Sequence, residues 1–397
     1  MDPTTNPFAP GAGAPPPEFA GRDEVLKSAT IAIARIRRGL AAKSLLMVGL
    51  RGVGKTVLLN RMADEAEATR VEVVRVEAPE KKSLPALIAP ALRIALLRLS
   101  RVEKSKELAQ RSLRALAGFF RSLKVSFGDL EVGLDAAPEP GLADNGDLTT
   151  DLTALFEVAG AAARAADSAV VFFIDELQYV VEEQLAALIS ALHRCAQRSL
   201  PVTLIGAGLP QLHGATGKAK SYAERLFEFV EIGPLSADDA ARAIVRPIEA
   251  LGERIDRDAV QRIFAETAGY AYFVQEWGKH AWEVALRSPI THADVEAASR
   301  VAVAKLDESF FRVRLDRLTP LERRYVRAMA ELGAGPHRSG VIAELLGRKV
   351  SSLGPTRDAL IRKGMIWSPA HGDTAFTVPL FDQFMQRAMP GTEWRGE

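Results

Sequence analysis

The sequence contains one cysteine, few aromatic residues and almost no excess of charge of either sign. Because Cys195 is alone, an intramolecular disulfide is excluded. Its helical spacing from Leu188, Ala191 and Leu192 indicates a buried side chain. Lys and Arg total 51 against 50 Asp and Glu, so only a local basic face would attract nucleic acid. No apolar run approaches the roughly 20 residues that cross a bilayer, and the first residues lack a signal-peptide pattern, so we expect a cytoplasmic protein without membrane contact.

The 397 residues are enough for two or three domains. Residues 1–17 are rich in Pro, Gly and Ala and are predicted to be a flexible segment. Over residues 18–233, short apolar runs alternate with helical patterns, which predicts a three-layer α/β/α domain with a parallel sheet. An insertion at about 100–147 begins with a cation-rich helical stretch, either a solvated face or a track for a partner. Loose alternation over 125–134 then favours a hairpin.

The strand signals stop after Pro234, and helix starts take their place. Residues 234–305 are therefore expected to form an all-α lid. Within residues 306–397, a capping box at Thr319 opens the first of three predicted helices. Two short strand patterns then flank the turn sequence His371-Gly372-Asp373. Three helices followed by a hairpin predict a winged helix-turn-helix domain.

The segment Gly-Leu-Arg-Gly-Val-Gly-Lys-Thr, which ends at Thr56, matches the phosphate-binding loop G-x-x-x-x-G-K-[ST]. A predicted strand precedes it and a predicted helix follows it, as the motif requires. Its glycines let backbone N–H groups approach a phosphate, Lys55 adds a charge near the β- and γ-phosphates, and the Thr56 hydroxyl binds Mg²⁺. The residues predicted to hold ATP here are Gly49, Gly52, Val53, Gly54, Lys55, Thr56 and Val57.

A second acidic motif supports this interpretation. The apolar run Val170–Ile174 leads directly into Asp175 and Glu176. We expect Asp175 to hold the magnesium and Glu176 to polarise the attacking water, which predicts hydrolysis as well as binding. The alternative is that both acids simply cap the next helix.

From these motifs and their order, the chain resembles the AAA+ ATPases of the origin-recognition-initiator type, roughly from Asn6 to Met389. The further markers are Phe19–Arg22, Asp175–Gln178, Gly206–Pro210, Ser221–Phe227 and Gly269–Gln275. The resemblance implies that Arg22 lines the adenine side of the nucleotide. It also implies that the strand ending near Gly206 lies between the loop strand and the Asp175 strand. A polar γ-phosphate sensor is expected on that strand, for which Thr203 and Gln211 are weak candidates.

The resemblance also assigns Arg225 the role of an arginine finger that reaches the nucleotide of a neighbouring subunit. The alternative is an arginine that forms an ordinary salt bridge. In the lid, Ala271 stands where a second sensor arginine or a proline is expected. The missing sensor predicts slow hydrolysis, with ATP acting as a switch.

The predicted winged helix carries candidate DNA contacts, because the second helix of such a motif enters the major groove. Its helical pattern runs over 355–363, and cations stand just ahead of it. The predicted contacts are Arg348, Lys349, Ser352, Thr356 and Arg357. Winged helices also serve as protein-interaction modules, and the balanced charge of the chain favours that alternative.

The sequence thus predicts an ATPase that acts as a nucleotide-controlled DNA-binding switch. One alternative is a signalling NTPase of the STAND type, in which the winged helix packs on the ATPase core and contacts proteins. Another is a helper ATPase for mobile-element functions, which shares the Asp-Glu-x-Gln pattern. A STAND-type switch predicts a monomer that retains ADP, whereas the other two predict ATP-driven assembly on DNA.

Overall fold

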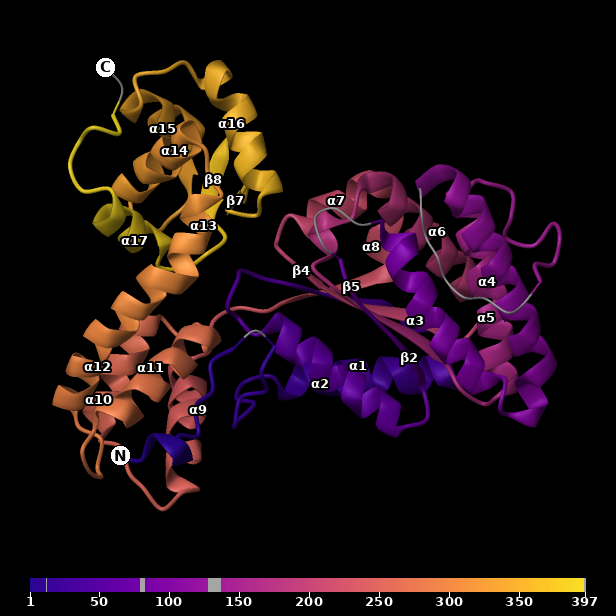
Figure 1. Cartoon of the computed structure of the whole chain (residues 1–397), viewed down its shortest axis with the longest axis horizontal. Coiled ribbons are helices and arrows are strands. Elements are labelled where there is room, and N and C mark those ends of the chain that lie inside the picture. The colour runs from indigo at the N-terminus through magenta and orange to yellow at the C-terminus, as the bar shows by residue number, and fades with distance from the viewer. Residues whose placement is uncertain (12, 79–82, 128–136, 396–397) are drawn as a thin grey trace.

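The computed structural model describes residues 1–11, 13–78, 83–127 and 137–395. A sheet with helices on both faces forms one half of the molecule, and a helical bundle with a small C-terminal region above it forms the other (Figure 1). The expected order of an α/β domain, an all-α region and a helical region with a hairpin is confirmed.

The sheet has five parallel strands in the order β2-β3-β4-β1-β5. They are β1 (Ser44–Val48), β2 (Glu72–Glu77), β3 (Val170–Asp175), β4 (Val202–Gly208) and β5 (Phe227–Glu231). Side chains alternate between the two faces of a strand, so Leu45 and Met47 enter one core while Leu46 and Val48 enter the other. The order places β4 between β1 and β3, as the family resemblance implies.

Helices α1 and α2 pack in the core on one face of the sheet, and α3 to α7 pack on the other face (Figure 1). The helices of this domain are α1 (Asp23–Arg37), α2 (Lys55–Ala68), α3 (Leu84–Leu99), α4 (Lys106–Phe127), α5 (Leu148–Ala165), α6 (Glu182–Gln197), α7 (Leu212–Ala219) and α8 (Ala223–Leu226). Cys195 is buried on α6, as expected, and burial raises the pKa of its thiol to about 12.

The prediction of a hairpin over 125–134 is wrong where it can be judged. Helix α4 continues to Phe127, because its regular apolar stripe outweighs the loose alternation at its end. Residues 128–134 of the predicted hairpin lie outside the described part of the chain.

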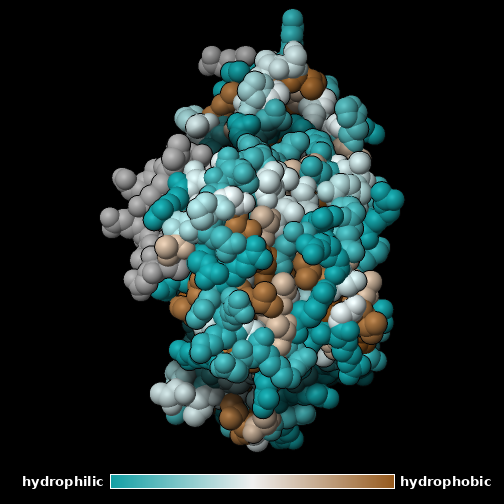
Figure 2. Space-filling model, turned by 90° about the vertical axis from the view of Figure 1, so that its right-hand side faces the viewer, coloured by the Kyte–Doolittle hydropathy of each residue, from teal (hydrophilic) through white to brown (hydrophobic). Residues whose placement is uncertain are grey.

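Several cations of the α3–α4 stretch form ion pairs, as in a solvated helix face. Arg111 and Arg114 lie 3.0 and 3.5 Å from the Glu139 carboxylate, and Lys104 lies 3.8 Å from Asp167. The outer face of the domain is mostly hydrophilic, with small hydrophobic patches between the polar groups (Figure 2).

The all-α region consists of α9 (Ala237–Glu249), α10 (Arg257–Thr267), α11 (Ala271–Val284) and α12 (His292–Lys305). The Ser236 side chain caps α9, and Thr291 forms a capping box with Asp294 at the start of α12. A π-helical turn (Leu306–Phe311) then joins α12 to the short helix α13 (Arg312–Asp316). The lid therefore continues without a loop into α13, and residues 317–319 then lead to the C-terminal region.

The N-terminal residues that the sequence indicates to be flexible lie against this lid. Phe8 is only 2% exposed, and it packs where Gly278 of α11 leaves space. The indole N–H of Trp282 donates to the carbonyl of Asp2 at 2.8 Å. Composition predicts a loose segment, but burial of the Phe8 ring outweighs that tendency. We call residues 1–11 and 13–17 the N-terminal strap.

The C-terminal region contains α14 (Pro320–Glu331), β6 (His337–Arg338), α15 (Ser339–Leu345), α16 (Val350–Arg362), β7 (Ile366–Trp367), β8 (Asp373–Phe376) and α17 (Phe381–Ala388). Strands β7 and β8 pair antiparallel, which confirms the predicted hairpin. Helix α16 begins at Val350, one turn before the predicted start at Pro355. Burial of Leu353 extends the helix despite the backbone hydrogen bond that the interior proline cannot donate.

One hydrophobic core extends from the lid into the C-terminal region. Phe311 of the π-helical turn stacks on Phe384 of α17 with a centroid distance of 5.2 Å, and it lies 6.3 Å from the ring of Phe273 in α11. These aromatic contacts pack the lid and the C-terminal region against each other. A movement of the lid would therefore be passed on to the C-terminal region.

Candidate nucleotide-binding site

The phosphate loop connects β1 to α2 at the carboxyl edge of the sheet. Gly52 and Gly54 have φ angles of 81° and 93°, in the left-handed region that favours glycine. At Gly49, a Cβ atom would lie 2.2 Å from the carbonyl oxygen of Ile232. The three glycines of the motif are thus required by backbone geometry and close packing.

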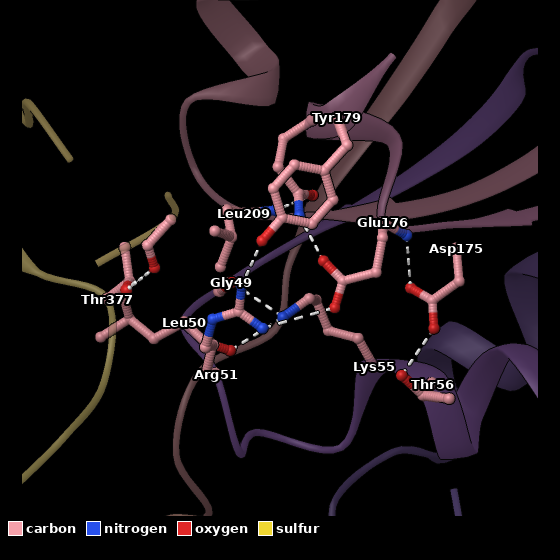
Figure 3. A network of polar contacts seen from close by, with 12 residues as sticks. Gly49, Leu50, Arg51, Lys55, Thr56, Asp175, Glu176, Tyr179, Leu209 and Thr377 are labelled. Carbon is pink, nitrogen blue, oxygen red and sulfur yellow. Dashed lines mark hydrogen bonds and ion pairs between the residues drawn. The ribbon is translucent and has the colours of Figure 1, made fainter. Parts of the chain in front are cut away.

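Lys55 turns back over the loop (Figure 3). Its Nζ donates to the carbonyl oxygens of Gly49 and Leu50 at 2.9 and 2.8 Å. Burial lowers the pKa of Lys55 to about 8, although the charges of Glu176 and Asp175 oppose that shift. A phosphate group would give this buried ammonium a stronger partner than the two carbonyls.

Thr56 and Asp175 meet at the end of β3 (Figure 3). The Thr56 hydroxyl donates to Asp175 Oδ2 at 2.6 Å, and the Glu176 N–H donates to Oδ1 at 2.8 Å. Burial raises the pKa of Asp175, whereas the Thr56 hydrogen bond lowers it. A buried carboxylate beside a hydroxyl supplies the hard oxygen ligands that Mg²⁺ prefers, so the donor set fits this ion.

Glu176 is held by its neighbours at the same edge of the sheet. Its backbone has a left-handed φ of 55°, and its side chain does not cap the following turn, which argues against the helix-cap alternative. The Gln178 amide donates to the Glu176 carboxylate, while Gln178 Oε1 accepts the N–H of Leu209 at 3.0 Å. Arg51 Nη1 lies 3.6 Å from Glu176 Oε1. The carboxylate therefore faces the loop in a fixed orientation.

The loop forms one wall of a cavity of about 420 Å³, within the range of roughly 300–1,000 Å³ that ligand sites occupy. The strap, Phe19, the lid and the helix α13 complete the wall. Arg22 lines the cavity and donates to the carbonyls of Val53 and Gly233 at 3.3 and 2.6 Å. Val53 and Val57 also line it. The cavity thus has a phosphate end at the loop and an apolar end at the strap.

Thr203 is not placed for the sensor role, and Gln211 is not among the described residues that line the cavity. Thr203 lies at the amino end of β4, where its hydroxyl is buried 3.1 Å from that of Ser44. Gln211 Oε1 is buried without a hydrogen-bond partner in the described structure. Ala271 lies against the loop, 3.9 Å from the place of a Cβ on Gly54. Because the Ala271 side chain carries no polar group, it cannot donate to a phosphate as an arginine would.

Arg225 is exposed on α8, just before β5. The start of β5 pairs with Ser44 at the amino end of β1, whereas the loop follows the carboxyl end of β1. Arg225 therefore lies at the edge of the sheet opposite to its own nucleotide site.

The candidate DNA contacts fall into two groups. Arg348, Lys349 and Ser352 are exposed at the start of α16. Thr356 is half-buried, and Arg357 donates to Thr374 Oγ1 at 3.1 Å and to a β8 carbonyl at 3.0 Å. Arg357 thus belongs to the internal framework of the hairpin.

Sequence reasoning missed the residues that join the site to the C-terminal region. The N–H of Arg51 donates to the carbonyl of Thr377 at 2.9 Å, and its Nη2 donates to Tyr179 Oη at 2.7 Å (Figure 3). At Gly364, a Cβ would lie 2.9 Å from Arg51 Nη2. The N–H of Tyr272 in the lid donates to the carbonyl of Gly52 at 2.9 Å. Arg51 occupies a variable position of the loop motif, so no local pattern indicates its role.

Comparison with known families gives two matches. The profile described as "AAA ATPase domain" matches residues 18–205. A profile described as a domain of unknown function, DUF8462, matches residues 308–385. No protein of curated function matches the chain in sequence.

Among solved structures, the chain is similar to the Walker-type ATPase Paby2304 of Pyrococcus abyssi, with 16% identity over 93% of this chain and 96% of that chain and a TM-score of 0.57. The RuvB Holliday junction branch migration motor of Thermotoga maritima has 17% identity over 90% of this chain and 92% of that chain, with a TM-score of 0.43. Orc1 of Aeropyrum pernix in complex with DNA has 15% identity over 93% of this chain and 93% of that chain, with a TM-score of 0.46. At such low identities, only the likeness to the first of these carries weight, and it concerns the fold alone.

Within the ranges that the structure describes, no helix has both the length and the apolar character needed to cross a membrane. The region matched by the ATPase profile contains the phosphate loop, Asp175 and Glu176, and it supplies most of the parallel sheet. Residues 18–205 are therefore identified as an AAA ATPase domain.

Proposed function

We propose that this protein is a slow ATPase of the origin-recognition-initiator type in which the bound nucleotide controls a DNA-binding winged helix. The observation that carries the proposal is the hydrogen bond from the Arg51 N–H to the Thr377 carbonyl, 2.9 Å long. It joins a residue of the phosphate loop directly to the residue that follows β8. A nucleotide that reshapes the loop would therefore act on the position of the C-terminal region.

In this proposal the nucleotide lies with its phosphates on the loop and its base toward the strap and Arg22. Lys55 leaves the two carbonyls that it contacts and binds the β- and γ-phosphates. Thr56 and Asp175 hold the magnesium, which neutralises developing charge on the phosphates when bound. Glu176 orients and polarises the attacking water.

Slow hydrolysis is supported by the contacts of Glu176. Its carboxylate accepts from Gln178 and pairs with Arg51 at 3.6 Å. Both contacts occupy carboxylate oxygens that would otherwise be available to accept from the attacking water. The Glu176 carboxylate would be free to accept from the attacking water when Arg51 moves away, which links the rate to the docking of the C-terminal region.

The exposed start of α16 supports a role in DNA binding. In a helix-turn-helix the N-terminal residues of the second helix meet base edges, and here they include Ser352 with Arg348 and Lys349 just ahead. Two exposed cations at a helix start would pair with phosphates. Arg357 would contribute indirectly, by holding the hairpin.

The proposal is tested by fluorescence anisotropy of a labelled duplex with ATP, with ADP and without nucleotide, at two salt concentrations. We expect the tightest binding with ATP and weaker binding as the salt concentration rises. Equal affinity in all three states would refute nucleotide control. If the duplex does not bind in any nucleotide state, the proposal of DNA binding is refuted, but the proposal of ATP hydrolysis is not affected.

The contact between the loop and the C-terminal region also favours the STAND-type alternative. Gly364 packs so closely on Arg51 and Tyr179 that a Cβ would lie 2.9 and 3.0 Å from their polar ends. In this alternative the docked state is closed and ADP-bound, and its release exposes a surface for a protein partner. Purification as a monomer with retained ADP would favour it over assembly on DNA. The helper-ATPase alternative rests on Gln178, which completes the Asp-Glu-x-Gln pattern, and it predicts assembly as well.

Self-assembly, if ATP drives it, would use Arg225. Because Arg225 lies opposite to its own phosphate loop, it could only reach the nucleotide of a neighbour. An Arg225→Ala variant should then bind ATP normally and lose hydrolysis only under conditions of assembly. Unchanged hydrolysis in an assembled variant would exclude this role.

A further inference from the structure

Arg314 is a half-buried cation at the nucleotide cavity that no motif indicates. It lies on α13, beyond the lid and before the C-terminal region, and it lines the cavity together with Arg51 and Phe310. Arg51 and Tyr179, which stand beside Glu176, are among the groups that interact electrostatically with Arg314. Arg314 therefore lies at the phosphate end of the cavity.

Arg314 is held in place by aromatic contacts. Its guanidinium carbon lies 3.8 Å from the centroid of the Phe310 ring, and its Nη1 donates to the Phe310 carbonyl. The Phe310 ring stacks on Tyr272 with a centroid distance of 5.0 Å. The N–H of Tyr272 in turn donates to Gly52 of the loop. A continuous series of contacts thus joins the loop to Arg314.

The charge of Arg314 lacks a carboxylate partner among the described residues. Burial, and after it the nearby charge of Arg51, lower the pKa of Arg314 to about 10. Two arginines that face one cavity repel each other, and a buried charge without a counter-ion is costly. An anion in the cavity would remove both costs, and the polyphosphate of a nucleotide is the anion that this loop binds.

We propose that Arg314 binds the terminal phosphate of ATP in place of the lid arginine that is absent at Ala271. The inference rests on the proposed nucleotide site and names the residue that distinguishes ATP from ADP. A guanidinium that turns toward the γ-phosphate releases the Phe310 carbonyl in the π-helical turn. ATP would in this way change the π-helical turn that connects the lid to α13, and ADP would leave this turn unchanged.

The test compares the affinities of ATP and ADP, each with Mg²⁺ and a fluorescent label, for four full-length proteins. They are the wild type, Arg314→Gln, Arg314→Lys and the control Arg312→Gln, an exposed arginine two positions earlier. We expect Arg314→Gln to weaken ATP binding about tenfold to a hundredfold, as for loss of a charge-assisted hydrogen bond, with ADP affinity within about twofold. Arg314→Lys should be intermediate, because lysine keeps the charge without the planar fork. Arg312→Gln should match the wild type.

The outcomes separate this inference from the proposed function. A wild-type ratio of ATP to ADP affinity in Arg314→Gln would overturn the inference, and so would an equal loss for both nucleotides, which indicates a structural role. Failure of the wild type to bind either nucleotide would instead overturn the nucleotide site itself. If Arg314→Gln does not fold, Arg314→Met preserves the packing over Phe310 and gives the same comparison. Hydrogen exchange over residues 306–311 should increase with ATP and not with ADP.

Discussion

The backbone N–H of Arg51 in the phosphate loop lies 2.9 Å from the carbonyl oxygen of Thr377 in the C-terminal region. The Arg51 side chain also reaches Tyr179 and Glu176, at 2.7 and 3.6 Å. One residue thus contacts the predicted general base and the element that the nucleotide is proposed to control. Changes at this residue should affect hydrolysis and docking together.

A methyl group at Gly364 should disturb that contact. A Cβ there would lie 2.9 Å from Arg51 Nη2 and 3.0 Å from Tyr179 Oη. Because the ends of side chains move easily, Gly364→Ala should displace Arg51 from Glu176. Loss of an ion pair of at most about 1 kcal/mol predicts a rise in hydrolysis of about twofold to fivefold. Phosphate release at saturating ATP measures this rate.

The matched control is Gly333→Ala. Gly333 also has a left-handed backbone, with a φ of 97°, but a Cβ there meets nothing within 4 Å. Both variants carry the cost of about 1–2 kcal/mol for a left-handed alanine. Only Gly364→Ala should change hydrolysis, and equal rates in both variants would contradict a link through Arg51.

Replacing the Glu176 carboxylate should separate binding from hydrolysis. Glu176→Gln keeps the size of the side chain and removes the base, so hydrolysis should fall by about 10²–10⁴-fold. ATP affinity should stay within a few-fold, because the loop, Lys55 and Thr56 are unchanged. Glu183→Gln, at an exposed position in the first turn of α6, serves as the control. A Glu176→Gln protein that hydrolyses ATP at the normal rate would assign the base to another residue.

The parts of the site that the sequence predicts are those encoded locally. The loop, its flanking strand and helix, and Asp175 with Glu176 each form a short continuous pattern with an apolar strand beside it. The structure brings Lys55, Thr56, Asp175 and Glu176 together as the parallel sheet requires. The position of β4 between β1 and β3 likewise follows from the family resemblance.

The rest depends on contacts between distant segments. The sequence of α5 has few polar residues, so its helical period is hard to detect. Burial fixes this helix instead, and the ring of Phe156 stacks on that of Phe172 with a centroid distance of 4.5 Å. Nothing near Phe8 in the sequence indicates the lid surface that buries it. The contact of Arg51 with Thr377 and the entry of Arg314 into the cavity likewise require the docked arrangement of three regions. No periodicity encodes such an arrangement.

The pH dependence of nucleotide binding should reflect Lys55. Its pKa is lowered by burial from the ordinary 10.5 to about 8, and phosphates should raise it again. ATP binding at about pH 9 should therefore take up a proton, and affinity should fall up to about tenfold per unit as the pH rises above about 8. Calorimetry in two buffers with different ionisation enthalpies measures the uptake, with about pH 7 as the control because Lys55 is already charged there.

The same shift affects the stability of the nucleotide-free protein. Between about pH 8 and 10.5 the unfolded chain holds the Lys55 proton and the folded protein does not, so the contribution of this group to stability rises with pH. Lys55→Met should remove that rise in thermal unfolding experiments. An identical pH profile in the variant would contradict a lowered pKa at Lys55.

The strap should contribute to nucleotide affinity, because Ala9, Pro10 and Pro16 line the cavity. Phe8→Ala removes the buried ring that anchors the strap and should cost about 3 kcal/mol in local stability. We expect faster proteolysis of the strap and weaker ATP binding. Thr4→Ala is the control, because Thr4 is exposed and bonds only to Asp2 nearby. Rapid proteolysis with unchanged ATP affinity would show that the strap does not form part of the site.

The DNA contacts should divide into phosphate contacts and structural support. Arg348→Ala and Lys349→Ala remove exposed cations, so each should lower the slope of log affinity against log salt by about 1. Arg357→Ala removes the donors to Thr374 and to a β8 carbonyl, so it should lower the thermal stability of the C-terminal region.

Anisotropy titrations at several salt concentrations measure these slopes, and Arg300→Ala, exposed on α12 and 3.9 Å from Glu296, is the control. A cation that only shapes the protein leaves the number of released counter-ions unchanged, whereas a phosphate contact changes it. Unchanged slopes in both Arg348→Ala and Lys349→Ala would therefore exclude the start of α16 as a DNA-binding surface. The same surface would then be expected to bind a protein partner, and the proposed nucleotide switch would still hold.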